Sequence, residues 1–130
     1  MKEIVELYVS IWNSNCIADL EEAFSKKSKY WDSTQEGGAI NLLTGSITAT
    51  HQAFSDILFQ IVSLNTSSEN QFFLEWQMTA TNTGEFFGYS PTGKRIEVQG
   101  LDSIKFESNR IIEIKSFYDS SLFGQQLGLQ

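Results

Sequence analysis

Apolar residues recur at helical spacing over the first 12 residues of the chain. The positions that repeat every three or four residues are Ile4, Leu7, Tyr8, Ile11 and Trp12. This spacing predicts an amphipathic helix with one face toward a core, and the polar run at residues 13–15 predicts its end. A second, shorter helix is predicted to begin at Asp19, whose carboxylate can cap free N–H groups.

The pattern is less regular between residues 24 and 55. Lysines at 26, 27 and 29 are predicted to close the second helix, and the polar, glycine-rich QEGG at 35–38 follows Asp32. AINLLTG, at 39–45, predicts a short strand because it is apolar and brief. Residues 50–54 predict a third helical turn.

Apolar and polar residues alternate through most of the second half of the chain. Strands are predicted at 56–64, 71–82, 95–106 and 111–118, separated by the turn-forming segments NTSSEN and ESNR and by a loop rich in glycine. In the second of these strands, the residues predicted to face inward are Phe72, Leu74, Trp76, Met78 and Ala80. Helices followed by hairpin-connected strands predict an α+β domain, with the helices on the concave side of a curved antiparallel sheet.

One carboxylate interrupts an apolar strand face. In RIEVQGLDSIKF, at 95–106, Asp102 shares its face with Ile96, Val98, Gly100, Ile104 and Phe106. A carboxylate among buried side chains is costly unless it is paired, hydrogen-bonded or protonated. Asp102 is therefore either a structural group, bonded to Tyr or Trp donors or to Lys115, or a group that contacts a ligand or transfers a proton.

The hairpin at ESNR leaves two strand registers open. A loop with an even number of residues would place Asp102 opposite Lys115 and turn Asp119 toward the same face. A three-residue turn with a bulge at Asn109 would instead bring Ile112 and Ile114 to the Asp102 side, with Asp119 turned away.

Composition and charge narrow the class of protein. A chain of 130 residues with 41% hydrophobic content predicts one domain over residues 1–130. A single cysteine, Cys16, and a single histidine, His51, lead us to expect no metal and no cofactor, and His51 is read as a surface or helix-end residue. A net charge of −7 argues against nucleic acid. No apolar run approaches membrane-spanning length, so we predict a cytoplasmic protein without a membrane partner.

GYSPTGKR, at 88–95, matches a phosphate-binding loop up to its last position. Arg95 stands where that loop needs a hydroxyl residue to hold magnesium, and the residues that follow alternate like a strand rather than a helix. The segment is therefore predicted to be a turn.

An ordered set of motifs resembles a known family. The motifs are T-x-T-x-T-G at 79–84, P-T-G-K at 91–94, G-x-D at 100–102, Y-D at 118–119 and Q-L-G at 126–128. Together they resemble the second half of a SnoaL-like domain, the polyketide-cyclase group of the superfamily that includes ketosteroid isomerase and nuclear transport factor 2. The resemblance implies a cone, formed by a strongly bent antiparallel sheet around helices, and often a homodimer joined through the sheet.

The resemblance also implies candidate site residues. The Y-D motif carries the catalytic acid and base of the family onto Asp119, with Tyr118 or a protonated Asp102 as donor to an enolate. The structural alternative for Asp119 is a role as N-cap of a helical turn at 120–123. The residues expected to line a hydrophobic ligand pocket are Trp31, Asp32, Trp76, Met78 and Phe117; Trp31 and Asp32 could instead end a strand at the cone mouth.

Three classes of function follow from these expectations. The first is a protein that binds a hydrophobic small molecule and performs cyclase-type or isomerase-type acid–base chemistry without a cofactor. The second is a non-catalytic carrier or sensor, and the third is a dimerisation module. Fold analogy does not separate them.

Overall fold

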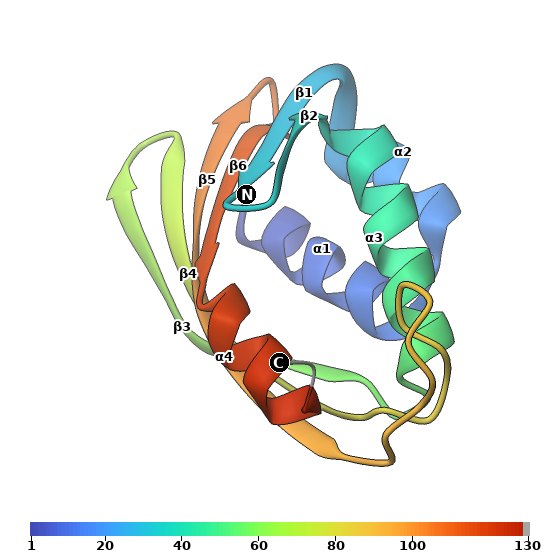
Figure 1. Ribbon diagram of the computed structural model, residues 1–130. Coiled ribbons are helices and arrows are strands. Elements are labelled where there is room, and N and C mark those ends of the chain that lie inside the picture. The colour runs from blue at the N-terminus through green and yellow to red at the C-terminus, as the bar shows by residue number, and fades with distance from the viewer. Residues whose placement is uncertain (129–130) are drawn as a thin grey trace.

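The computed structural model describes residues 1–128 and consists of helices wrapped by one curved sheet (Figure 1). In chain order the elements are α1 (Lys2–Ser14), the 3₁₀ helix η1 (Ile17–Asp19), α2 (Leu20–Ala23), β1 (Phe24–Asp32), β2 (Gln35–Gly38), α3 (Ala39–Ala53), β3 (Leu58–Ser68), β4 (Gln71–Thr81), β5 (Arg95–Glu107), β6 (Arg110–Tyr118) and α4 (Ser120–Leu127). None of the helices within residues 1–128 is long and apolar enough to cross a membrane.

The six strands form one sheet in the order β2-β1-β6-β5-β4-β3. Neighbouring strands are antiparallel except β1 and β6, which run parallel. The predicted α+β class is confirmed, but the predicted all-antiparallel sheet is corrected to a mixed one. Parallel strands need a long connection, and the chain between β1 and β6 supplies one through α3 and the four strands β2 to β5.

The concave face of the sheet and the helices enclose the core. Alternate residues of β4 and β5 point inward and are buried, as predicted, and so are Ile111 and Ile114 of β6. Val5 and Ile11 of α1 and Leu43 and Ile47 of α3 complete this core from the helical side. In Figure 1 α1 lies in the hollow of the sheet, α3 closes the hollow on the side away from β3 and β4, and α4 crosses the lower part of the sheet.

Helix α4 is attached to the edge of β5 by a side-chain amide that bonds to both backbone groups of one strand residue. The Gln126 amide accepts a hydrogen bond from the Glu97 N–H (2.7 Å) and donates one to the Glu97 carbonyl (2.8 Å). Leu127 is fully buried. These contacts hold α4 against β5, where Ser120 and Phe123 of the helix face the interior of the cone.

Residues 39–45, predicted as a short strand, belong to helix α3. The buried positions Ala39, Leu43 and Ile47 repeat every four residues, which is helical spacing. A seven-residue window shows only part of this repeat, and the threonines and glycine within the segment obscure it. The turn predicted at 50–54 is the end of the same helix.

Residues 24–38 also differ from the prediction. The lysines expected to end a helix lie on β1, and the QEGG segment forms β2. In β1, buried Ser28, Tyr30 and Asp32 alternate with Lys29 and Trp31, so the buried face of the strand is partly polar. The predicted Asp19 cap is wrong as well, because η1 precedes α2 and Asp19 makes no capping hydrogen bond.

The β5–β6 hairpin combines features of both predicted registers. Ser108 and Asn109 have positive φ angles and form a two-residue turn, so Phe106 pairs with Ile111. A bulge next to this pair then shifts the register by one, and Asp102 faces Ser116 instead of Lys115. The GYSPTGKR segment is followed by strand β5 from Arg95, as predicted.

Candidate functional site

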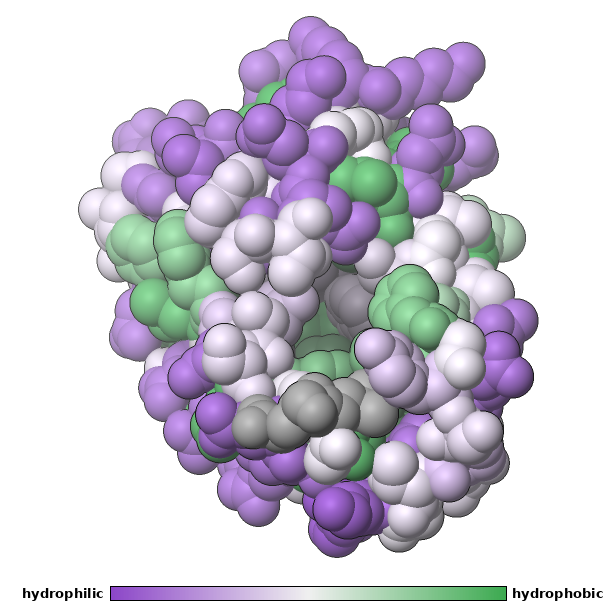
Figure 2. Space-filling view, in the orientation of Figure 1, coloured by the Kyte–Doolittle hydropathy of each residue, from purple (hydrophilic) through white to green (hydrophobic). Residues whose placement is uncertain are grey.

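A cavity of about 380 Å³ opens into the interior of the cone. In Figure 2 the surface is hollowed at this place and the floor of the hollow is hydrophobic. Aromatic residues from two helices, four strands and the β4–β5 loop dominate the wall: Tyr8, Trp12, Tyr30, Phe59, Trp76, Phe86, Phe87, Tyr118 and Phe123. Volume and lining are typical of a site for an apolar small molecule.

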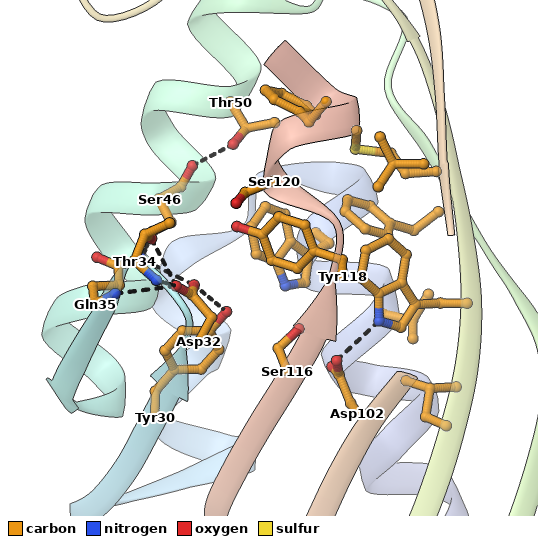
Figure 3. A pocket seen from close by; sticks show the side chains of 18 of the residues that line it. Tyr30, Asp32, Thr34, Gln35, Ser46, Thr50, Asp102, Ser116, Tyr118 and Ser120 are labelled. Atoms are coloured by element: carbon orange, nitrogen blue, oxygen red, sulfur yellow. Dashed lines mark hydrogen bonds between the residues drawn. The ribbon is translucent and has the colours of Figure 1, made fainter. Parts of the chain in front are cut away.

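Asp102 projects into this cavity from the middle of β5 (Figure 3). Its side chain is 3% exposed, and its Oδ1 accepts a hydrogen bond from the Trp76 Nε1–H at 2.9 Å. Burial raises the pKa of Asp102 to about 6, while hydrogen bonds from Ser116 and Trp76 limit the rise and the negative charge of Asp32 adds to it. Asp102 therefore changes its protonation state close to neutral pH.

Gly100 makes the contact between Trp76 and Asp102 possible. Gly100 pairs with Trp76 across β4 and β5, and a Cβ at position 100 would overlap the indole ring. Without a side chain there, the ring lies over β5 and brings its N–H to the carboxylate two residues further on. Phe59 and Tyr118 pack against the same indole with ring centroids 5.4 and 6.1 Å away.

Asp32 is the second carboxylate of the cavity and ends β1. Its Oδ1 accepts hydrogen bonds from the Thr34 N–H and hydroxyl, both at 2.7 Å, and from the Gln35 N–H at 3.1 Å. Its Oδ2 accepts from the Tyr30 hydroxyl at 2.9 Å and from the Gln35 amide at 3.5 Å. We call these donors, from Tyr30, Thr34 and Gln35, the Asp32 cradle (Figure 3).

The cradle keeps Asp32 ionised. Burial raises its pKa, but the hydrogen bonds from Thr34, Tyr30 and Gln35 together outweigh burial, so the pKa of Asp32 lies below its ordinary value of 3.8. The cavity thus contains one carboxylate that is held as an anion and another that titrates near pH 6.

Three tyrosines surround the carboxylates. Burial raises the pKa of Tyr8, and the negative charge of Asp102 adds to this rise. Burial and then the charge of Asp32 raise the pKa of Tyr118, and burial raises that of Tyr30. All three phenols therefore stay protonated at neutral pH and can donate hydrogen bonds.

The structure brings five of the predicted site residues together. Asp32, Trp76, Met78, Asp102 and Tyr118 all line the cavity. The bulge in the β5–β6 hairpin accounts for the place of Tyr118 in this group, because it turns Ser116 and Tyr118 to the side of Asp102.

Three predicted residues lie outside the cavity. Trp31 and Phe117 pack against each other, with ring centroids 5.3 Å apart, on the outer face of the sheet, because their neighbours Asp32 and Tyr118 point inward. Phe117 and the nearby Leu101 are about half exposed. The homodimer predicted through this face stays a prediction.

Asp119 is the N-cap of α4, the alternative considered from the sequence. Its Oδ1 accepts a hydrogen bond from the Leu122 N–H at 3.0 Å, and its side chain is exposed. It lies beside a separate surface depression between β5 and α4. The geometry therefore assigns Asp119 a capping contact and brings Asp102 and Asp32 to the cavity in its place.

Sequence reasoning missed Tyr8, Tyr30 and the cradle residues Thr34 and Gln35. Tyr8 was assigned only to the core stripe of the first helix, although a phenol in such a stripe carries a polar hydroxyl that needs a partner. The cradle had a weaker signal, an aspartate followed by T-Q, which matches a turn in which a carboxylate accepts from the next backbone N–H groups.

His51 lies at the end of α3, as predicted, and its Nε2 is 2.6 Å from the Trp12 carbonyl oxygen in a hydrogen bond. Within residues 1–128 no three His, Cys, Asp or Glu side chains are grouped as a metal site would require. The ionisable side chains that line the cavity are carboxylates and phenols.

The fold and the cavity define an α+β cone of the kind that binds small molecules. The profile of the SnoaL-like polyketide cyclase family matches residues 2–127, and the chain belongs to that family. The resemblance seen in the motifs of the second half is thus confirmed over nearly the whole chain. A comparison of this sequence with curated protein sequences found no match.

Solved structures share the fold at low sequence identity. TsrD of Streptomyces laurentii superposes with a TM-score of 0.86 at 16% identity, over 99% of this chain and 95% of its own. AclR of Streptomyces galilaeus, a proposed hydroxylase, superposes with a TM-score of 0.85 at 21% identity, over 99% of this chain and 81% of its own. IdmH of Streptomyces antibioticus, a proposed polyketide cyclase, has a TM-score of 0.84 at 18% identity, over 98% of this chain and 97% of its own.

Proposed function

We propose that this protein binds a hydrophobic carbonyl compound in its cone and transfers a proton at a carbon next to the carbonyl, in a cyclase-type or isomerase-type reaction. The observation that carries the proposal is Asp102, a buried carboxylate in an apolar cavity whose pKa is raised to about 6. Membership of the SnoaL-like family and the description of IdmH as a proposed polyketide cyclase agree with this class of reaction.

Asp102 is the better base of the two cavity carboxylates. With a pKa of about 6, roughly nine-tenths of it is ionised at pH 7, yet it is a stronger base than an ordinary aspartate. Asp32 is less basic, and five hydrogen bonds already occupy its two oxygens. We therefore give the proton transfer to Asp102 and the role of a fixed anion to Asp32.

Tyr8 and Tyr118 are the candidate donors to the substrate oxygen. Both line the cavity, and the raised pKa of each keeps its hydroxyl protonated while negative charge develops nearby. A phenol aimed at a developing enolate oxygen stabilises it more in an apolar cavity than in water.

The proposed reaction conserves charge within the cavity. Asp102 takes a proton from the substrate carbon, and the electron pair of the broken C–H bond moves to the carbonyl oxygen as an enolate. Return of the proton to another carbon gives an isomer. Attack of the enolate carbon on a second carbonyl gives a ring, and the new oxyanion takes the proton back from Asp102.

Exchange of α-protons in deuterated water tests the proposal. With 2-tetralone as a carbon acid, we expect the wild type to accelerate exchange, measured by proton NMR, and Asp102→Asn to lower the rate by at least about 100-fold. The wild-type rate should rise as the pH passes through about 6, because only ionised Asp102 is a base.

Asp119→Asn is the matched control, since it removes the same charge outside the cavity. Loss of exchange in this variant, with Asp102→Asn unchanged, would overturn the assignment and return the role to Asp119. If 2-tetralone enters the cavity, as displacement of a fluorescent probe would report, but exchanges no faster than in buffer, the carrier alternative fits better.

A further inference from the structure

The proposed chemistry leaves the fixed anion of the cavity without a role. Asp32 is 4% exposed, and its donors come from its own strand and from the turn into β2. Five hydrogen bonds to one side chain exceed what is needed to end a strand. They allow a carboxylate to stay charged inside an apolar cavity, where a lone charge would be protonated or expelled.

Positive charge is missing from the same wall. Among residues 1–128, the side chains that line the cavity include Asp32 and Asp102 but no lysine, arginine or histidine. The side chains of Lys27, Arg95 and Lys105 form ion pairs with Glu107, Asp56 and Glu113, none of which lines the cavity. The potential inside the cavity is therefore negative at neutral pH.

We infer that Asp32 is a specificity-determining residue that makes the cavity select ligands without negative charge. The substrate class is then a neutral or cationic apolar carbonyl compound, in which any carboxyl group that enters the cavity is masked as an ester or amide. The carbonyl group in this statement rests on the proposed function, whereas the charge selection applies equally to a carrier.

The physical reason is the low dielectric of the cavity. Two like charges repel far more strongly among apolar side chains than in water, and an anionic ligand would also lose its hydration. A neutral substrate avoids both costs, because the proposed proton transfer moves one negative charge from Asp102 to the substrate without adding another. Repulsion of a wrong ligand is a common source of specificity.

A pair of fluorescent probes isolates the charge. N-phenyl-1-naphthylamine is neutral, and 8-anilinonaphthalene-1-sulfonate is the same molecule with one sulfonate added. Both brighten when they enter an apolar site, so titration gives a dissociation constant for each. We expect the wild type at about pH 8 to bind the neutral probe at least about tenfold more tightly than the sulfonate.

Variants at the Asp32 cradle test the cause. Asp32→Asn should lower the dissociation constant of the sulfonate probe by at least about fivefold, while the dissociation constant of the neutral probe should change by less than about twofold. If that variant folds poorly, Gln35→Lys offers a second route, since it sets an ammonium group beside an intact Asp32 and should tighten the sulfonate in the same way. Glu21→Gln, at an exposed position of α2, removes one charge outside the cavity and should leave the ratio unchanged.

The contribution of Asp102 is separated by pH. At about pH 5 roughly nine-tenths of Asp102 is protonated, whereas Asp32 stays ionised, so discrimination that survives there belongs to Asp32.

The inference is overturned if the wild type binds both probes equally, if neither probe binds, or if Asp32→Asn and Gln35→Lys leave the ratio unchanged. Loss of α-proton exchange in Asp102→Asn is a separate result, so failure of the reaction and failure of the charge selection are distinguishable.

Discussion

Asp32 and Asp102 line one cavity and are almost equally buried, yet their pKa values move in opposite directions. Asp32 is the last residue of β1, where the chain turns into β2 and the N–H groups of Thr34 and Gln35 point at its carboxylate. Asp102 lies in the middle of β5, between β4 and β6. Both carboxylates are hidden from solvent, but Asp102 lies deeper among apolar groups and fewer donors reach it.

The difference shows what backbone geometry does to a buried charge. In the middle of a sheet the backbone N–H groups are used by neighbouring strands, so only the side chains of Trp76 and Ser116 reach Asp102. At a turn, backbone N–H groups are free and can solvate a carboxylate. A fixed anion at the strand end and a titratable group in mid-strand therefore follow from the topology.

Removal of Asp32 should have the largest effect. Asp32→Ala leaves the Tyr30 hydroxyl and the Thr34 and Gln35 N–H groups without an acceptor, and we expect a loss of at least about 3 kcal/mol in the free energy of unfolding. Urea titration at pH 7 measures it. The wild type should also lose stability as the pH falls below 3.8 through the lowered pKa of Asp32, because protonation weakens the hydrogen bonds of the cradle. A loss under about 1 kcal/mol would show that the cradle does not stabilise the fold.

The ionisation of Asp102 should change stability in the opposite direction with pH. Because its pKa rises from 3.8 to about 6 on folding, the wild type loses up to about 3 kcal/mol of stability as the pH rises from about 4 to about 6. Asp102→Asn keeps an acceptor for Trp76 and should escape this loss, so it should be the more stable protein at pH 8 and no more stable at pH 4. Urea unfolding at both values decides it, and a difference that does not depend on pH would contradict the raised pKa.

Gly100→Ala sharpens the comparison by disturbing Asp102 alone. The new methyl group overlaps the Trp76 ring, so we expect a loss of about 1–3 kcal/mol and a further rise in the pKa of Asp102 as the indole N–H moves away. Gly45→Ala is the matched control, because open space surrounds that position in α3 and alanine should add about 0.5–1 kcal/mol. If both variants change stability alike, the close approach of Trp76 is not what position 100 provides.

Asp119 gives the smallest expected effect. Asp119→Ala removes the cap of α4 and should cost about 1 kcal/mol in the free energy of unfolding. Thermal unfolding at pH 7 measures it. A loss above about 3 kcal/mol would mean that this carboxylate does more than cap the helix.

Strands β4 and β5 were predictable because each repeats strictly with period two over ten or more residues. Asp102 stood out for the same reason, as the one charge on an apolar face. Helix α3 was missed because its buried face is small and interrupted, and β1 because its buried side is partly polar. For such elements the tertiary environment outweighs local pattern.

Site residues were predicted unevenly for a related reason. Alternation along a strand assigned Trp76, Met78 and Asp102 to one face correctly. It did not resolve which of Tyr118 and Asp119, or of Trp31 and Asp32, points inward, because adjacent residues face opposite sides and a bulge of one residue exchanges them. The bulge beside Phe106 decided the first pair.

Local periodicity was enough to predict the α+β class, the inward faces of the long strands and a carboxylate that needs a partner in the core, because all three depend on residues close together in the chain. The three-dimensional arrangement established which carboxylates share the cavity and which of them titrates near neutral pH. Those properties depend on hydrogen-bond donors brought from other strands and turns, such as Trp76 for Asp102, and on the position of a single bulge. Such contacts join residues far apart in the chain, so no local pattern encodes them.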